Sequence, residues 1–594
     1  MEGQLADGRP DPRALPAGRR SGGGPAPPTR RDRRSAVLLL LPALVALTVL
    51  FALPLINVAW QSFTDPTFGI DNYTSLFTDG YTLRVLGRTV LTALVVTFVG
   101  MVLAYPYAYA MTIVGPTARA VLVTVVLVPF WTSMLARNFA WLVLMQNDGV
   151  IQKYLLAPFG FGDTVLLGTN TGVAISMTQV MLPFMVLPMY SRMQQIDRRL
   201  VKAAQGLGAG RVSAFRKVYV PLSLPGVVAG ASLVFVLALG FYVTPALLGS
   251  PQSALIAQVI NTQARELLDF GGAGAMGMFL LVVALAVLGV SRLLAGRGAG
   301  GLSQAVATTG GGSGAAESVR APWLRAYTAI AGLFLVAPSL VVIPMSFSSG
   351  QTFQFPPQGW SVRWYERLFT SPEWTASILN SLQVAVITAV LATVLGTAAA
   401  VGLTRAPERV RGAANGFLLS PLTVPHILIA LVVFSVFLRM GLNGKLIGII
   451  LAHTALALPF VVIAVFTRLR GMDPRLADAA AGMGARPWSV FRRVTLPLAM
   501  PGVASGAVLA FVSSLDEVVV ALFLQGPAAI TLPVQMFNSV ALQIDPTISA
   551  ASSVMVVGVS VPILLAQVAG ARRGAAKAGG TGKADGTGKA GDPR

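Results

Sequence analysis

Apolar and polar positions follow one another along this chain in long blocks. Twelve segments of about 20 residues carry almost no charge, which is the length and character of a helix that crosses a bilayer. We therefore predict an all-α integral membrane fold of about twelve transmembrane helices. The predicted spans lie near residues 36–58, 89–112, 120–143, 171–191, 227–248, 273–295, 324–346, 379–403, 413–438, 446–467, 503–525 and 547–570.

The twelve segments form two sets of six. Residues 197–227 and 473–503 align without a gap at an offset of 276, and 17 of their 31 positions are identical. Because each half holds an even number of spans, both halves have the same orientation, which makes this a parallel duplication about an axis along the membrane normal.

The chain divides by composition into five predicted parts. We expect a first repeat at 35–295 and a second at 323–570, joined by a flexible cytoplasmic linker rich in Gly, Ser and Ala at 296–322. Basic tails at 1–34 and 571–594 are predicted to be disordered.

Composition excludes several kinds of chemistry. The sequence has no cysteine and only two histidines, so we expect no metal site and no thiol or histidine catalysis. It also lacks the G-x-x-x-x-G-K-[ST] phosphate loop, so we expect the chain to bind no ATP in that manner. A membrane enzyme is therefore disfavoured.

The net charge of +21 is unevenly distributed. With both termini placed in the cytoplasm, 35 of the 44 Lys and Arg residues fall on cytoplasmic segments and 8 on outer loops. This asymmetry is the positive-inside rule, and it predicts a multi-pass protein of the cell membrane. We expect the basic segments to contact anionic lipid rather than nucleic acid.

The duplicated loop is polar and basic and lies between apolar segments. In the first copy, residues 200–207 are predicted to form a short helix with Ala203 and Ala204 on one side, where a partner can approach closely. Gly208 suits the left-handed position that ends a helix. A connector duplicated along with everything else would not explain why this loop is better matched than the spans. We therefore predict a docking surface.

A second short helix is predicted at residues 212–219. It presents Phe215, and Pro221 is expected to halt it before the next span. The corresponding residues of the second copy are Ala479, Ala480, Gly484, Phe491 and Pro497.

The pattern A-A-x-G-x-G-A, then Phe, then P-L-x-x-P-G, resembles the EAA loop of ABC importer permeases. The resemblance covers both halves and implies a type I importer transmembrane domain. It implies that the loop docks a separate dimeric ATPase, which would bind the ATP and Mg, and that an extracytoplasmic solute-binding protein delivers the solute. The family's leading Glu falls on Asp478 in the second half but on Lys202 in the first, so the two docking sites are expected to be unequal.

More local strings are similar to spermidine/putrescine importers. FYVTPALLG at 241–249 resembles the first permease of such systems, while SLDEVVVALF at 514–523, TLPV at 531–534 and FPPQGW at 355–360 resemble the second. The chain thus looks like two permeases fused in order. Importers of iron, thiamine, opines or other small organic solutes share parts of these strings. A secondary transporter of the major-facilitator kind remains an alternative that leaves the duplicated loop unexplained.

Two acids are predicted deep within a span. Asp516 and Glu517 lie about 14 residues beyond Gly502, roughly 20 Å into the helix, where ionisable groups usually face a pathway or a partner. They can meet the amines of a polyamine, or they can serve only to bind neighbouring helices. Tyr242, near the equivalent position of the first half, is a candidate for a cation contact. Arg137 is the one base placed inside a span, and we expect it to pair structurally.

Overall fold

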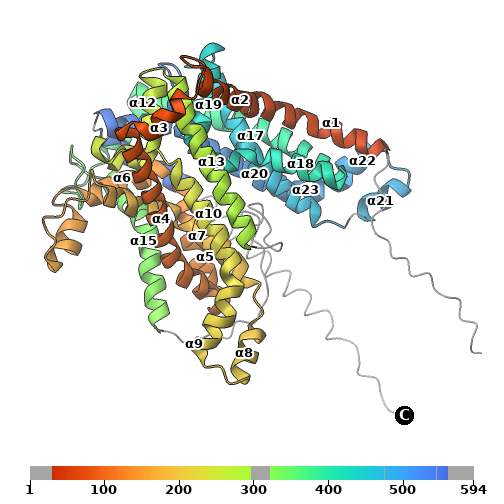
Figure 1. Cartoon of the computed structure of the whole chain (residues 1–594), viewed down its shortest axis with the longest axis horizontal. Coiled ribbons are helices and arrows are strands. Elements are labelled where there is room, and N and C mark those ends of the chain that lie inside the picture. Colours follow the sequence, from red (N-terminus) through yellow and green to blue (C-terminus); the bar gives the residue numbers. More distant parts are fainter. Residues whose placement is uncertain (1–29, 296–321, 474, 544, 559–594) are drawn as a thin grey trace, which may run out of the picture.

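The computed structural model describes residues 30–295, 322–473, 475–543 and 545–558, most of which are helical (Figure 1). The helices of the first half are α1 (Arg30–Leu47), α2 (Leu53–Thr64), α3 (Asp71–Thr78), α4 (Gly80–Ile113), α5 (Pro116–Trp131), α6 (Met134–Met145), α7 (Asn170–Gln194), α8 (Arg198–Gly206), α9 (Arg211–Ala214), α10 (Val220–Leu239), α11 (Val243–Leu248), α12 (Ile256–Arg265) and α13 (Phe270–Ala295).

The second half repeats this order. Its helices are α15 (Pro322–Ser346), α16 (Arg363–Thr370), α17 (Pro372–Arg405), α18 (Glu408–Leu418), α19 (His426–Arg439), α20 (Leu446–Arg470), α21 (Arg475–Gly482), α22 (Pro487–Val490), α23 (Leu496–Leu515), α24 (Val519–Leu524), α25 (Leu532–Asn538) and a final helix, Thr547–Gly558. The predicted linker and C-terminal tail, and most of the N-terminal tail, lie outside the described residues, although α1 already begins at Arg30.

Within the described residues, nine helices are long and apolar enough to cross a membrane. The pair α5 and α6 makes a tenth candidate, bent by 89° between them. The shorter apolar helices α19 and Thr547–Gly558 lie at the two remaining predicted spans. The all-α membrane fold is thus confirmed.

The first helix shows how the apolar pattern sorts side chains between protein and lipid. Leu40, Ala43 and Leu47, at helical spacing, are at most 2% exposed, whereas Leu38 is 70% exposed. The buried stripe packs along α17, where Gly402 permits the approach: a Cβ at Gly402 would lie 2.8 Å from Leu40 Cγ. The exposed apolar side chains form the surface that faces the bilayer.

Each half gives its first helix to the other. Helix α1 packs on α17 and α18 of the second half, and α15 packs on α4, α5 and α6 of the first half (Figure 1). The exchange joins the halves into one molecule.

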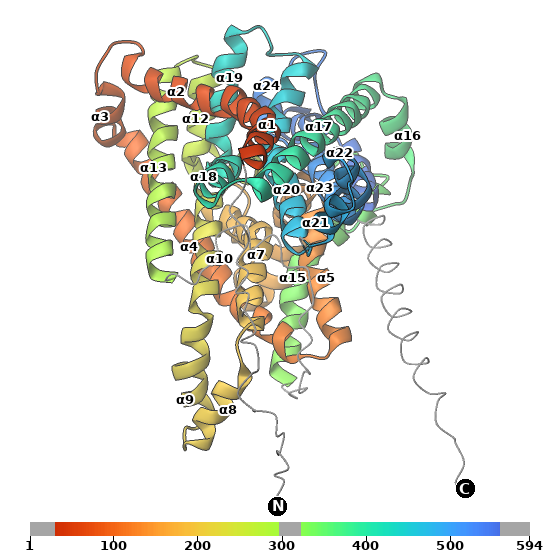
Figure 2. The same ribbon diagram turned by 90° about the vertical axis from the view of Figure 1, so that its right-hand side faces the viewer.

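The two bundles are inclined to one another. In Figure 1 helices α4, α10 and α13 run from top to bottom, whereas α1, α17, α20 and α23 run across the view. Figure 2 shows α8 and α9 at the lower end of one bundle, well separated from α21 and α22. The element order repeats as predicted. The two duplicated loops, however, do not lie on the same face of the molecule in this conformation.

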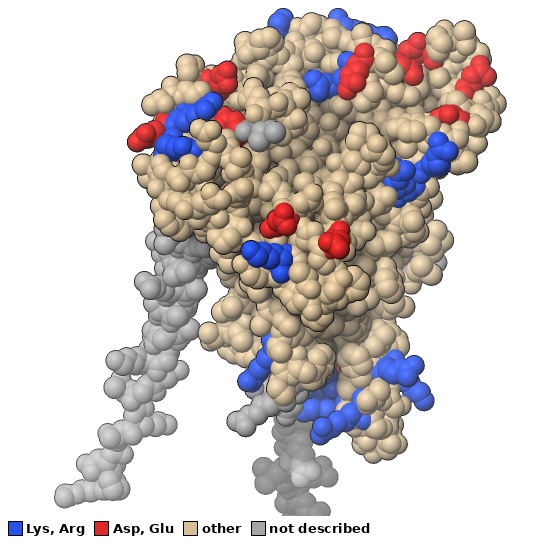
Figure 3. Space-filling model, turned by 90° about the vertical axis from the view of Figure 1, so that its left-hand side faces the viewer, with Lys and Arg blue, Asp and Glu red and all other residues tan. Residues whose placement is uncertain are grey.

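Basic side chains extend further down the molecular surface than acidic ones. Figure 3 shows Lys and Arg over much of that face, with one group of them at the lower end, where α8 and α9 lie, and Asp and Glu mainly in the middle and upper parts. Loop 197–227 is therefore a basic projection.

Four predicted spans are broken rather than continuous. The third predicted span breaks between α5 and α6, and the ninth between α18 and α19, because the backbone before α6 and α19 is extended at Ser133 and Pro425. The fifth span ends with α10 at Leu239, and the eleventh ends with α23 at Leu515. All four breaks bring helix ends, with their unpaired backbone groups, into the interior.

Candidate functional site

The duplicated loop forms the same structure in both halves. Asp197 caps α8 by accepting a hydrogen bond from the backbone N–H of Arg199 at 2.9 Å, and Asp473 accepts one from Arg475 at 3.0 Å before α21. Both helices end at a glycine in the left-handed region, Gly208 at φ +88° and Gly484 at φ +82°. The expected termination by glycine is confirmed.

The predicted docking residues lie on the surface. Ala203 and its counterpart Ala479 are exposed, while Ala204 and Ala480 are half-buried. The next apolar side chain in each loop is the most exposed. Leu207 is 90% exposed, and its counterpart Met483 is 83% exposed. The remaining predicted contacts are exposed Lys202, Gly208 and Gly484, half-buried Phe215 and Phe491, and Asp478, which α21 contains.

The predicted end of the second short helix at Pro221 is wrong. Residues 211–239 form one helical run, in which a π-helical turn, Phe215–Tyr219, precedes Pro221. We attribute its continuity to that turn, which is wider than an α-helical one and makes room for the proline ring. The second half repeats the arrangement with the π-helical turn Phe491–Thr495 before Pro497. The second short helix, α9, is therefore continuous with membrane helix α10, whereas α8 is separated from α9 by the turn at Gly208.

A glycine in each half holds that membrane helix against its neighbour. A Cβ at Gly226 would lie 2.6 Å from Arg192 Cβ, and one at Gly502 would lie 2.8 Å from Arg468 Cβ. Helices α10 and α7, and likewise α23 and α20, pack closely because these positions lack a side chain.

The two loops differ in how they are anchored. The ring of Phe215 contacts those of Tyr105, Tyr109 and Tyr219, with centroids 6.5, 5.4 and 5.3 Å away. Phe491 makes its described ring contact with Trp488, at 5.4 Å, on its own loop. The first loop is thereby fixed to α4, while the second has no comparable aromatic anchor among the described residues.

Asp516 lies where the two halves meet. Its carboxylate accepts hydrogen bonds from the backbone N–H of Met134, 382 residues away, at 3.2 Å to Oδ1 and 3.1 Å to Oδ2. Met134 is the first residue of α6, so the acid caps the broken helix of the other half. Buried Arg137, one turn further along α6, interacts electrostatically with Asp516.

The neighbouring polar residues extend this junction. Glu517 Oε1 accepts a hydrogen bond from the Val520 N–H at 2.9 Å, at the start of α24. His453 is buried, and its Nδ1 lies 2.9 Å from Ser514 Oγ. His453 is therefore a hydrogen-bonded core residue.

The equivalent junction of the other half lacks a carboxylate. Gly240, at the position of Asp516 by the 276-residue offset, abuts the start of α19: a Cβ there would lie 2.6 Å from Pro425 Cβ and 3.5 Å from the backbone nitrogen of His426. Two pseudo-equivalent contacts thus join the halves, and one of them carries an acid.

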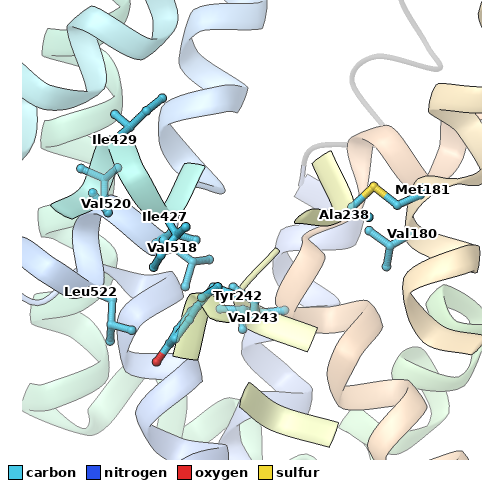
Figure 4. Close-up of a cluster of buried hydrophobic side chains, with 14 of the residues drawn as sticks. Val180, Met181, Ala238, Tyr242, Val243, Ile427, Ile429, Val518, Val520 and Leu522 are labelled. Carbon is cyan, nitrogen blue, oxygen red and sulfur yellow. The ribbon is translucent and has the colours of Figure 1, made fainter. Parts of the chain in front are cut away.

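Tyr242 lies in apolar surroundings. It is 6% exposed, and its ring stacks on that of Phe537 with a centroid separation of 6.1 Å. Figure 4 shows it beside Val243 and close to Val518 and Ile427 of the second half. The structure therefore groups Asp516, Glu517 and Arg137 at a polar junction and places the tyrosine in the hydrophobic core beside it.

Comparison with known proteins fits this architecture. The family described as binding-protein-dependent transport system inner membrane component matches residues 97–297 and 392–573. The chain belongs to this family. As an inner membrane component of such a system it is a multi-pass permease, and the two matches confirm the predicted fusion of two permease units. The alternative of a major-facilitator transporter is not favoured.

Individual relatives correspond in length to about one half of this inner membrane component. The spermidine/putrescine transport system permease protein PotC of Escherichia coli (strain K12) is 33% identical over 235 residues, or 40% of this chain and 89% of PotC. The putrescine transport system permease protein PotI of that strain is 35% identical over 252 residues, or 41% and 89%. The strain's spermidine/putrescine permease protein PotB is 34% identical over 231 residues, or 37% and 83%.

A bacterial alginate ABC transporter solved with its periplasmic protein is 18% identical and covers 45% of this chain and 96% of its own, with a TM-score of 0.40. That likeness is too remote to add to the argument.

Proposed function

We propose that this permease forms the membrane pathway through which a polyamine is imported, driven by a separate ATPase that binds its two duplicated loops. The proposal depends mainly on the substrates of the similar proteins. Three proteins that are 33–35% identical to parts of this chain are spermidine/putrescine or putrescine permeases. Import of iron, thiamine or opines is not favoured by these relatives.

The loops supply the features that a docking site needs. Each offers an exposed alanine and a protruding apolar side chain, Leu207 or Met483, on or just after a short helix that a glycine turn joins to the helical run of a membrane helix. Force that reaches the loop beyond this turn is transmitted along one helical run to α10 or α23. The ATP and Mg belong to the ATPase dimer, and a solute-binding protein delivers the polyamine on the outer side.

Binding of one ATPase dimer sets a geometric requirement. Because both bundles must cross the same bilayer, we infer that their axes align in the membrane and that both loops then face the cytoplasm. The termini lie on the same side, as the excess of basic residues on the assigned inner segments supports.

The acids at the junction of the halves suit a cationic solute. Asp516 and Glu517 lie where the end of α23 meets the starts of α6 and α24, and protonated amines are the complementary charge. A pathway between two halves that move against each other must pass such a junction.

Reconstitution tests the proposal directly. The permease is placed in proteoliposomes with its ATPase and solute-binding protein, and uptake of radiolabelled spermidine and putrescine is measured with ATP or with a non-hydrolysable analogue. We expect uptake with ATP alone. Uptake of an uncharged or anionic solute in place of both amines would refute the polyamine assignment.

A matched variant locates the pathway. Asp516→Asn combined with Glu517→Gln keeps the side-chain volumes and removes both charges. We expect uptake to be abolished while ATPase binding, measured by co-purification, is unchanged. Wild-type uptake by the double variant would remove these acids from the pathway.

A further inference from the structure

Arg137 is a buried cation whose hydrogen bonding is incomplete. Its side chain lies within α6 and is only 7% exposed, yet its Nε has no hydrogen-bond partner. A guanidinium removed from water ordinarily has its donors satisfied, because each unpaired buried donor is destabilising. An incompletely paired arginine at the junction of the two halves therefore needs an explanation.

The charge that balances Arg137 comes from the other half of the molecule. Asp516 acts electrostatically on Arg137, but its two oxygens are also shared with the Met134 backbone N–H. The carboxylate thus hydrogen-bonds the start of α6 and attracts the guanidinium that lies one turn further along the same helix. This arrangement leaves Arg137 attracted to Asp516 without the full set of hydrogen bonds that would lock the pair.

The pseudo-equivalent junction shows that the acid is not needed for packing alone. There Gly240 meets the start of α19 by direct contact with Pro425 and without any charge. A helix end can therefore be accommodated at this position by close approach, so the Asp516–Arg137 pair adds something beyond the joining of the halves.

We propose that Arg137 is a tethered cation that neutralises Asp516 between transport cycles and is displaced from it by an ammonium group of the solute. The inference rests on the proposed function, since it needs a cationic solute. An ammonium group replaces the guanidinium charge for charge, whereas a neutral or anionic solute cannot. Arg137 is therefore a specificity-determining residue, and it also keeps the carboxylate from remaining unpaired when the pathway is empty.

Replacement of Arg137 tests whether its guanidinium competes with the solute for Asp516. Solute binding and solute uptake are measured separately. The affinity of purified permease in nanodiscs for radiolabelled spermidine is measured by equilibrium dialysis, and uptake is measured in proteoliposomes. Arg137→Gln removes the competitor, so we expect the dissociation constant to fall about tenfold, the size of one close charge pair, while maximal uptake falls because release is slower. Arg137→Lys keeps the competing charge and is expected to retain both wild-type values.

A second pair of variants separates competition from a structural role. In the Asp516→Asn background, spermidine binds weakly, and adding Arg137→Gln is expected to change its affinity no further. This double variant, Asp516→Asn with Arg137→Gln, carries neither charge. It can therefore be measured even if Arg137→Gln alone leaves an unbalanced acid that prevents assembly. Unchanged spermidine affinity in a folded Arg137→Gln variant, or wild-type affinity in this double variant, would overturn the inference.

Wild-type uptake separates this inference from the proposed function. If the wild-type permease docks its ATPase but transports and binds no polyamine, the substrate assignment fails. If the wild-type permease imports spermidine and the Arg137 variants bind it as the wild type does, only the tethered-cation inference fails.

Discussion

Replacement of Gly208 by valine probes the turn that ends the first docking helix. Gly208 has φ +88°, a conformation that a residue with a Cβ adopts at a cost of about 1–2 kcal/mol. Nothing lies within 4 Å of a Cβ built there, so the added Cβ itself meets no clash. We therefore expect the backbone conformation to be the main source of the effect.

The magnitude follows from that cost. About 1–2 kcal/mol corresponds to a factor of roughly 5–30 in the population of the native turn. If the ATPase requires this turn, the same factor appears in its affinity. We expect Gly208→Val to weaken binding of the ATPase to permease nanodiscs by about tenfold, measured by biolayer interferometry. Asparagine tolerates left-handed backbone, so Gly208→Asn is expected to lose much less.

Gly206, two residues earlier, provides the matched control. It lies inside α8, and a Cβ there also meets nothing within 4 Å. Alanine suits a helix, so Gly206→Ala is expected to preserve binding or strengthen it slightly. Equal affinities for wild type, Gly208→Val and Gly206→Ala would refute the reasoning that the turn positions the docking surface.

Three further substitutions test how the loops are held. Gly226→Val forces a side chain against Arg192, where a Cβ would lie 2.6 Å from Cβ, so we expect a loss of about 1–3 kcal/mol, seen as a lower melting temperature in detergent. Phe215→Ala removes three aromatic contacts and Phe491→Ala one, each worth about 0.5–1.5 kcal/mol, so the first variant is expected to melt at a lower temperature. Equal melting of the two phenylalanine variants would contradict the unequal anchoring of the loops.

Hydropathy and the duplicated loop predict most of the fold because both are local properties of the sequence. An apolar stretch of span length has few alternatives to a membrane helix, and the left-handed glycines follow from the end of a helical pattern. Asp516 could be singled out from the sequence because ionisable groups stand out in an apolar segment.

The features that sequence reasoning missed depend on contacts between distant residues. Nothing local shows that α1 and α15 are exchanged between the halves or that Asp516 caps α6 across 382 residues. The breaks after Leu239 and Leu515 were missed because Gly240 and Asp516 lie in otherwise apolar runs. The π-helical turn before Pro221 was missed because a proline ordinarily indicates the end of a helix.

The central claim is that both duplicated loops bind one ATPase, and a distance between them tests it most directly. The chain has no cysteine, so Leu207→Cys and Met483→Cys place one spin label on each exposed loop tip without further changes. In nanodiscs, pulsed electron paramagnetic resonance gives the distance distribution with and without the ATPase and ATP. If one ATPase holds both loops, we expect it to narrow the distribution and ATP to shorten the distance, as the loops are drawn together. A distribution unaffected by saturating ATPase, with or without ATP, would contradict it.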